Sequence, residues 1–267
     1  MSSGASQIAR FEYNGATLVD EVSGDLTAGH ILFLHGWGGS RESLRGIGTL
    51  FQHTHCVHLL DLPGFGEAPP PPESWGTNEY ADLVQQYILE RINAPVVLVG
   101  HSFGGRVSVR LGSRRLALVK EIVLLGVPGL PQPTFTRRKL RAWGIRTLRR
   151  ALIAAQPLIG ERGVRWHTER FGSKDYQAAG VLRPVLVRTV TEDLTESASN
   201  ITCRVLLVWG IDDTETPPWL AHRYAALLGS KARLVLLPHK DHHLYTGTGA
   251  HLIGQKMREW MATEAHD

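Results

Sequence analysis

The sequence predicts an α/β fold, in which a mostly parallel, doubly wound sheet carries helices on both faces and an inserted helical lid. Three observations predict it: six short apolar runs recur along the chain, helical patterns separate them, and the alternation stops between about residues 127 and 200. The runs are apolar throughout, as expected of strands buried on both faces. We therefore expect residues 1–126 and 201–267 to form the sheet core and residues 127–200 to form the lid.

The elements follow in order along the chain. A hairpin is expected first, over residues 9–21, because Asn14-Gly15 suits a tight turn and the stretch looks less buried than the later runs. The six runs predicted as core strands are Ile31–Leu34, Val57–Leu60, Val96–Val99, Ile122–Leu125, Val205–Val208 and Leu234–Leu237. The helical patterns between and after them are Ser40–Phe51, Asn78–Arg91, Phe103–Leu111, Pro217–Leu228 and Ala250–Met261.

The interrupting segment is helical and basic. Its residues 136–170 hold ten basic and two acidic side chains, against a net charge of +4 for the whole chain. One helix there is amphipathic, with Leu140, Trp143 and Leu148 on its apolar face and arginines opposite. We expect Trp143 to contact substrate under the lid. The arginine face is interpreted as solvated surface, with attraction of an anionic substrate or lipid surface as the alternative.

Composition excludes several classes of protein. A hydrophobic fraction of 43% excludes disorder, and two cysteines, Cys56 and Cys203, are too few for a disulfide scaffold. No apolar stretch reaches the ~18–20 residues that span a bilayer, and the first ten residues lack the form of a signal peptide. We therefore expect a soluble, cytoplasmic protein with reduced thiols. No nucleic-acid partner is expected, because the basic segment has few aromatic residues to stack on bases.

The sharpest motif is Gly100-His101-Ser102-Phe103-Gly104, a G-x-S-x-G. It follows an apolar run and opens a helical pattern, so Ser102 is expected on a tight strand-to-helix turn with its hydroxyl clear of the sheet. The helix N-terminus would direct backbone N–H groups at a developing anion. This context favours a catalytic serine over an ordinary glycine-rich turn.

A serine nucleophile needs a base, usually a histidine held by a carboxylate. Two candidate clusters follow in the chain order serine, acid, histidine, and each comes just after a predicted strand. The first holds Asp212 and Asp213, and the second holds His239, His242 and His243. Parallel strands gather such groups at one edge of the sheet.

These motifs resemble those of the α/β-hydrolase family, of the esterase type with a helical cap. The matching stretches are His35-Gly36-Trp37-Gly38-Gly39, Asp61-Leu62-Pro63-Gly64-Phe65-Gly66, Gly210-x-x-Asp213-x-x-x-Pro217 and the late His242. The sequence departs from the family at Asp241, where a glycine is usual. The resemblance implies that Ser102 is the nucleophile, His242 the base and Asp213 the orienting acid. The backbone N–H groups of Trp37 and Phe103 would form the oxyanion hole.

Several neighbouring residues remain in competition or in supporting roles. His243 is the alternative base and Asp212 the alternative acid, each less favoured than its neighbour. His35, His101 and His243 flank the expected site, so we expect them to contact substrate or hold the surrounding loops. His239 and His242 could resemble a metal pair, but no third ligand set accompanies them, so no metal is expected. No phosphate-binding or dinucleotide motif is present, so no cofactor is expected.

The sequence thus predicts a serine hydrolase that cleaves a small to medium carboxylic ester through an acyl-enzyme. Lactone, thioester or carbon–carbon bond hydrolysis could use the same residues. Two alternatives from other classes are a low-turnover ligand-binding receptor with this fold and a basic protein that associates with membranes or polyanions. An apparently complete set of Ser102, Asp213 and His242 argues against the receptor.

Overall fold

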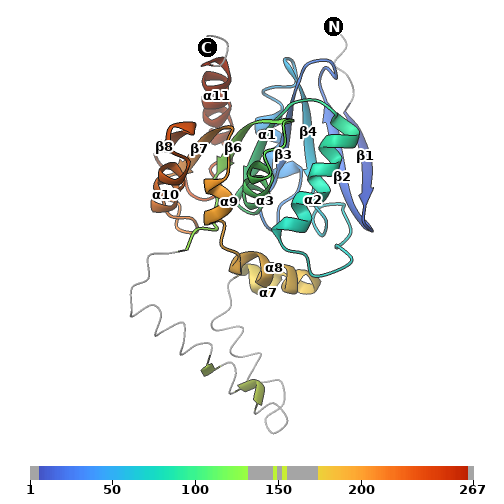
Figure 1. Ribbon diagram of the computed structural model, residues 1–267, viewed down its shortest axis with the longest axis vertical. Coiled ribbons are helices and arrows are strands. Elements are labelled where there is room, and N and C mark those ends of the chain that lie inside the picture. The colour runs from blue at the N-terminus through green and yellow to red at the C-terminus, as the bar shows by residue number, and fades with distance from the viewer. Residues whose placement is uncertain (1–5, 132–146, 149–151, 155–173, 264–267) are drawn as a thin grey trace.

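The computed structural model describes residues 6–131, 147–148, 152–154 and 174–263 (Figure 1). Its centre is an eight-stranded sheet with the order β1-β2-β4-β3-β5-β6-β7-β8. The strands are β1 (Gln7–Tyr13), β2 (Ala16–Ser23), β3 (Gly29–Leu34), β4 (His55–Asp61), β5 (Val96–His101), β6 (Val119–Leu125), β7 (Arg204–Gly210) and β8 (Ala232–Leu237). All neighbours from β4 to β8 pair in parallel, and each predicted apolar run lies within a strand, which confirms the predicted fold class.

The N-terminal hairpin forms where Asn14-Gly15 predicted it. Asn14 and Gly15 have φ values of 50° and 73°, the left-handed pair that a two-residue hairpin turn requires. β1 lies at the sheet edge and is mostly exposed, whereas β2 is largely buried because it pairs antiparallel with both β1 and β4. The expectation of a less buried hairpin therefore holds for β1 and is wrong for β2.

Helices cover both faces of the sheet. They are α1 (Glu42–Gly48), α2 (Thr77–Tyr87), η1 (Ile88–Ile92), α3 (Ser102–Ser113), α10 (Trp219–Leu228), η3 (Gly229–Lys231) and α11 (Gly249–Ala262). On one face, α1 and α11 bury Leu44, Ile253 and Met257 against the sheet. On the other face, α2, α3 and α10 bury a second, larger core, with Tyr80 and Tyr224 fully enclosed.

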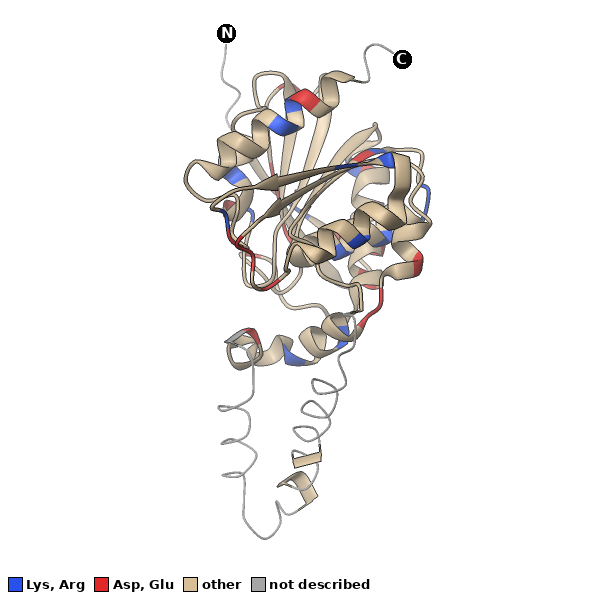
Figure 2. Ribbon diagram, turned by 90° about the vertical axis from the view of Figure 1, so that its left-hand side faces the viewer, with Lys and Arg blue, Asp and Glu red and all other residues tan. Residues whose placement is uncertain are grey.

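Besides short helical pieces at residues 147–148 and 152–154, the segment expected as the lid contains α7 (Lys174–Ala178), η2 (Gly180–Leu182), α8 (Arg183–Thr191) and α9 (Thr195–Ser199). Both views place α7 and α8 below the sheet, beyond the edge at which the parallel strands end, while α9 returns to contact α3 (Figures 1 and 2). Trp143 and most of the arginine-rich helix lie outside the described residues.

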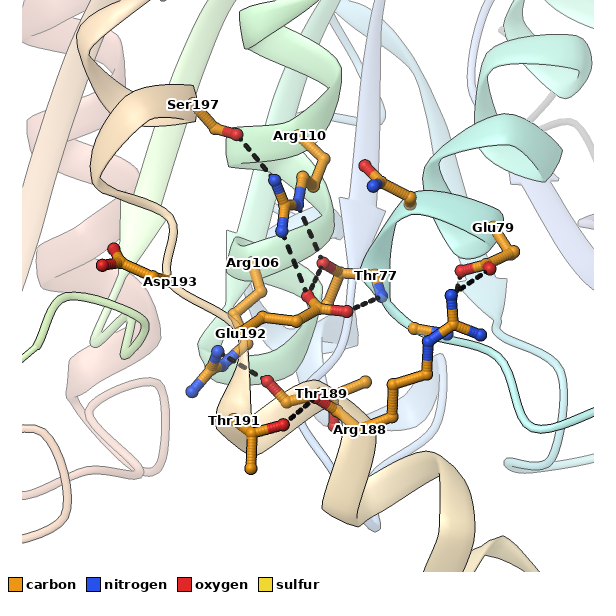
Figure 3. Close-up of polar contacts among 12 residues, drawn as sticks. Thr77, Glu79, Arg106, Arg110, Arg188, Thr189, Thr191, Glu192, Asp193 and Ser197 are labelled. Carbon is orange, nitrogen blue, oxygen red and sulfur yellow. Dashed lines mark hydrogen bonds and ion pairs between the residues drawn. The ribbon is translucent and has the colours of Figure 1, made fainter.

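Polar contacts that are buried or partly buried hold α8 and α9 to the core (Figure 3). The Glu192 carboxylate accepts hydrogen bonds from the backbone N–H of Thr77, at 2.9 Å, and from the Thr77 hydroxyl, and it lies 3.5 Å from the Arg110 guanidinium. Arg110 also donates to the hydroxyl of Ser197 at 2.9 Å. Arg106 donates to the carbonyl of Thr189 at 2.8 Å. Together these contacts join α8 and α9 to the N-terminus of α2 and to one face of α3.

Two expectations from composition can be compared with this structure. Cys56 and Cys203 are both free, as predicted, with Cys56 buried and Cys203 half-buried. Among the helices that the structure describes, none combines the length and hydropathy that a membrane crossing requires. Charged residues are spread over several elements of the described part rather than gathered on one (Figure 2).

Candidate active site

Ser102 occupies the sharp turn that the G-x-S-x-G motif predicted. β5 ends at His101 and α3 begins at Ser102, so no loop separates strand from helix. Ser102 has a φ of 46°, a left-handed conformation that costs a non-glycine residue about 1–3 kcal/mol. Strain of this kind persists only where the surrounding structure enforces it. It is typical of a serine that must project from the end of a strand.

The glycines around Ser102 enforce this turn by allowing close backbone approach. A Cβ at Gly104 would collide with the backbone carbonyl of Leu34, and one at Gly100 with Gly104 and Ser108. The backbone N–H of Gly104 also donates to the carbonyl of His35 at 3.0 Å. The helix start is thereby pressed against the end of β3, and no larger residue fits at either glycine.

Asp213 and His242 meet across two loops at the same edge of the sheet. Asp213 follows β7 and His242 follows β8, and both side chains are buried. The Nδ1 atom of His242 lies 2.9 Å from Oδ2 of Asp213, so the ring carries its proton on Nδ1 and donates it to the carboxylate. Its other nitrogen, Nε2, is left to face the neighbouring hollows.

Asp213 is fixed by the turn that follows it. Its Oδ1 accepts the backbone N–H groups of Glu215 and Thr216 at 2.9 and 2.7 Å, and its Oδ2 accepts the Thr216 hydroxyl at 2.6 Å. Burial alone would raise the pKa of Asp213, but these bonds and the one from His242 outweigh it and lower that pKa. Asp213 is therefore an anion held in one orientation.

The pKa of His242 is raised. Burial of the ring opposes this shift, but the hydrogen bond and charge of Asp213 outweigh it, and the nearby carboxylate of Glu215 adds to the effect. An Oε2 atom of Glu215 lies 3.7 Å from Nε2 of His242. The protonated ring is thus favoured by two carboxylates, one at each of its nitrogens.

Ser102 and His242 line two adjoining hollows at this edge. One, of about 160 Å³, is mainly apolar and lies beneath α8, with Phe103, Leu186 and Val190 in its wall. The other, of about 260 Å³, is more polar and includes His101, His243 and Tyr245. Five residues belong to both hollows: Trp37, Ser102, Asp175, Glu215 and His242.

Trp37 and Phe103 line the apolar hollow together with Ser102. Trp37 lies in the loop after β3, and Phe103 is the second residue of α3. Their rings meet edge to face with centroids 5.6 Å apart. The N–H groups in the first turn of a helix have no partner within that helix, so the N–H of Phe103 can serve a ligand.

The structure does not bring His35 to either hollow, which corrects the expectation that it contacts substrate. Its Nδ1–H donates to the carbonyl of Gly36 at 2.8 Å, and its Nε2 accepts the backbone N–H of Leu62 at 3.1 Å. Both nitrogens are therefore used within the protein. His35 instead joins the loop after β3 to the loop after β4.

His101 lies at the wall of the polar hollow but its main contact is with the loop after β8. Its Nε2–H donates to the backbone carbonyl of His242 at 3.0 Å. Complete burial lowers the pKa of His101 to about 3, so the ring is neutral at physiological pH. It can position the backbone of His242 without adding charge to the site.

The structure also separates the competing neighbours in each cluster. His243 is exposed, and its Nδ1 lies 3.2 Å from the hydroxyl of Tyr245 rather than near Asp213. Asp212 is exposed, whereas Asp213 is buried against the imidazole. The geometry thus pairs Asp213 with His242 and places His243 at the rim of the polar hollow.

Three further residues contribute to the site that the sequence analysis did not select. Thr216 bonds Asp213 and also lies 3.2 Å from Nδ1 of His242, Glu215 approaches Nε2, and Arg106 lines the apolar hollow. The turn itself had a sequence signal, because an Asp side chain commonly accepts a backbone N–H from its own turn, as Asp213 does from Glu215. Arg106 had a weaker one, lying one helical turn after Ser102.

The strained serine, the buried acid–histidine pair and the sheet define a protein of the α/β-hydrolase class. Residues 31–250 match the alpha/beta hydrolase family, and the chain belongs to it. The fold is also that of a solved structure described as a putative lipase from Acinetobacter baumannii. That match has a TM-score of 0.74 at 18% identity, over 98% of this chain and 93% of the other.

Two curated relatives are similar in sequence. One is a pimeloyl-[acyl-carrier protein] methyl ester esterase from Chromobacterium violaceum, 27% identical over 72% of this chain and 80% of its own length. The other is a probable lysophospholipase, BODYGUARD 3, from Arabidopsis thaliana, 30% identical over 45% of this chain. The match spans only 24% of the length of that plant protein.

Proposed function

We propose that this protein is a serine esterase that cleaves carboxylic esters of small to medium size. The observation that carries the proposal is that Ser102, on its strained turn, and His242, which is bonded to Asp213, line the same two hollows. Both curated relatives carry names of ester-cleaving enzymes, which supports the same class of reaction.

In the first half of the proposed reaction, Nε2 of His242 accepts the hydroxyl proton of Ser102 while Oγ attacks the ester carbonyl. The negative charge that develops on the carbonyl oxygen is stabilised by the N–H groups of Trp37 and Phe103. Loss of one such donor costs about 2.7–4 kcal/mol of barrier. His242 then gives the proton to the leaving alcohol, and the acyl group remains on Ser102.

In the second half, His242 takes a proton from water as the water oxygen attacks the acyl carbonyl. The bond from the acyl carbon to Oγ then breaks, His242 returns the proton to Oγ of Ser102, and the carboxylic acid leaves. Asp213 keeps the ring oriented and stabilises its charged form in both halves. The two hollows then hold the two sides of the ester, with the acyl group in the apolar hollow beneath α8 and the alcohol in the polar one. Their volumes, about 160 and 260 Å³, suit groups of a few carbons.

We further propose that residues 127–200 act as a lid over these hollows. Asp175 of α7 and Leu186 and Val190 of α8 already line them, so this segment supplies wall residues on the side away from the sheet. Such a lid would exclude water and select the substrate.

The test is hydrolysis of p-nitrophenyl esters from acetate to octanoate, together with the corresponding methyl esters. We expect the wild type to turn over and Ser102→Ala and His242→Ala to lose at least about 10³-fold in kcat. His243→Ala is the matched control and should retain most of its activity. A folded wild type that cleaves none of these esters, or an active Ser102→Ala, would contradict the proposal.

A further inference from the structure

A second cluster of reactive side chains lies away from Ser102, near the starts of β3 and β4. His30 and Cys56 are direct partners in the parallel pairing of these strands, and His58 follows Cys56 by two residues. Because side chains alternate across a sheet, all three project from the same face. One nitrogen from each histidine and the Cys56 sulfur lie within 4.8 Å of one another.

A chain of hydrogen bonds orients the His58 ring. The Tyr87 hydroxyl donates its single proton to Oδ2 of Asp20 at 2.7 Å, so its oxygen must accept from the Nδ1–H of His58, 2.9 Å away. The lone pair of His58 is therefore on Nε2. That atom lies 2.9 Å from Nδ1 of His30 and 3.4 Å from Sγ of Cys56.

This arrangement is the one that metal-binding histidines adopt, with the distal ring nitrogen held by a carboxylate-based partner that fixes the tautomer. Here the carboxylate acts through a phenol. The other oxygen of Asp20, Oδ1, is buried and has no hydrogen-bond partner among the described residues. A buried acceptor needs a hydrogen-bond partner, and the neighbouring cavity, whose wall includes Asp20, has room for a water molecule that can supply it.

Two of the three ligand distances are close to those around a small tetrahedral cation, and the third, between Sγ of Cys56 and a nitrogen of His30, is at most 4.8 Å. Bond lengths of about 2.0–2.3 Å to nitrogen and sulfur place the ligand atoms of a tetrahedral Zn²⁺ about 3.3–3.6 Å apart. The Cys56–His58 distance already fits, and the His30–His58 distance requires the His30 ring to move by a few tenths of an ångström. His30 is half-exposed, so its ring has room to make that shift.

A large cavity provides access to the cluster. Its volume is about 970 Å³, and its wall includes His30, His58, Asp20 and Tyr87. Cys56, by contrast, is fully buried behind them. An ion could therefore enter from the cavity side, and a water molecule in the cavity could complete its coordination.

We propose that Nδ1 of His30, Sγ of Cys56 and Nε2 of His58 bind one divalent cation of the zinc type, with water as the fourth ligand. Binding displaces the proton of the Cys56 thiol, and the His30 ring carries its proton on Nε2 instead of Nδ1, so both imidazoles remain neutral. The cation would join β3 to β4 and, through His58 and Tyr87, would fix the end of α2. No metal is expected from the sequence, because its one candidate pair, His239 and His242, lacks a third ligand. His30, Cys56 and His58 match no motif, since only the strand register brings them together.

The test is a metal titration of the reduced, chelator-treated full-length protein, with Zn²⁺ followed by competition calorimetry and Co²⁺ followed by absorbance. We expect one equivalent to bind and Co²⁺ to give visible tetrahedral bands with a thiolate charge-transfer band. Cys56→Ser should abolish the charge-transfer band, and His30→Ala should weaken Zn²⁺ binding at least about tenfold. Tyr87→Phe, which keeps the ring but removes the phenol, should weaken it about 10–100-fold.

Two matched controls separate this site from general thiol or imidazole binding. Cys203→Ser removes the other thiol, and His55→Ala removes another histidine in the wall of the same cavity. Both should bind Zn²⁺ like the wild type. The proposal would be overturned if the wild type did not bind one equivalent of Zn²⁺. It would also be overturned if Cys203→Ser lost the charge-transfer band, or if His30→Ala bound Zn²⁺ as tightly as the wild type. Because His30 is half-exposed, that variant remains informative even if Cys56→Ser fails to fold.

Discussion

Replacement of Asp213 by asparagine tests the proposed mechanism at one atom. Oδ1 of Asp213 accepts two backbone N–H groups, so the amide oxygen of an asparagine must take that position. Its NH₂ group then takes the position of Oδ2, facing Nδ1 of His242, which lies 2.9 Å away. Two donors cannot bond each other, so the imidazole must move its proton from Nδ1 to Nε2. The nitrogen that faces the hollows then cannot accept the proton of Ser102.

The magnitude follows from this change of tautomer. Where an asparagine forces the wrong tautomer on a catalytic histidine, kcat falls about 10⁴-fold while the geometry is kept. At about 1.36 kcal/mol per tenfold change, that is about 5.5 kcal/mol of barrier. The fold should survive, because both bonds to Oδ1 persist and the Thr216 hydroxyl can rotate to accept from the new NH₂ group.

The assay is kcat and KM for the best p-nitrophenyl ester, with circular dichroism to check the fold. Asp212→Asn is the matched control, because the same substitution at the exposed neighbour leaves the pair untouched. We expect a loss of about 10⁴-fold in kcat for Asp213→Asn and less than threefold for the control. If Asp213→Asn stays within tenfold of the wild type while His242→Ala is inactive, Asp213 does not orient the base.

Three other changes probe strain, charge and anchoring. Ser102→Gly removes the cost of a left-handed serine. The variant should be inactive, yet its free energy of unfolding in urea should be about 1 kcal/mol higher than that of Ser102→Ala. Equal stability of the two variants would contradict backbone strain at this turn. Because His242 must be neutral to act as a base, its raised pKa should move the acid limb of the kcat/KM profile to higher pH. Glu215→Gln removes one cause of that raised pKa and should move the limb back to lower pH. An unmoved limb would show that the charge of Glu215 does not affect the pKa of His242. Glu192→Ala should reduce the free energy of unfolding by about 1–3 kcal/mol, because it leaves buried donors unpaired. The control Glu196→Ala, at an exposed position, should change that free energy by less than about 0.5 kcal/mol. Equal effects of the two substitutions would contradict the idea that Glu192 holds α8 to the core.

Much of the fold could be predicted from the sequence, because it depends on local patterns. The continuous apolar runs predicted the buried parallel strands, since only strands covered on both faces can be apolar at every position. The hairpin at Asn14-Gly15 followed from backbone preference alone. The burial of β2 could not be predicted, because it depends on the pairing of β2 with β4, and no local sequence pattern indicates that pairing.

Part of the candidate site could likewise be predicted from the sequence, and part depends on the tertiary structure. The turn at Ser102 was predicted because its glycines and serine are adjacent in sequence, and chain order placed the acid and histidine clusters after later strands. Adjacent residues within a cluster differ only in the direction in which the loop points them. That direction decides that His242 rather than His243 meets Asp213, and that both nitrogens of His35 are used by the backbone.

The sequence by itself therefore determined the sheet, the strand-to-helix turn and the kinds of residues gathered at one edge, because these depend on periodicity and on neighbours along the chain. Only the tertiary structure decided which atoms meet. Thr216 and Glu215 at His242 depend on the packing of loops after different strands. The grouping of His30 with Cys56 depends on the register between β3 and β4, because that register makes neighbours of residues that are far apart in the sequence.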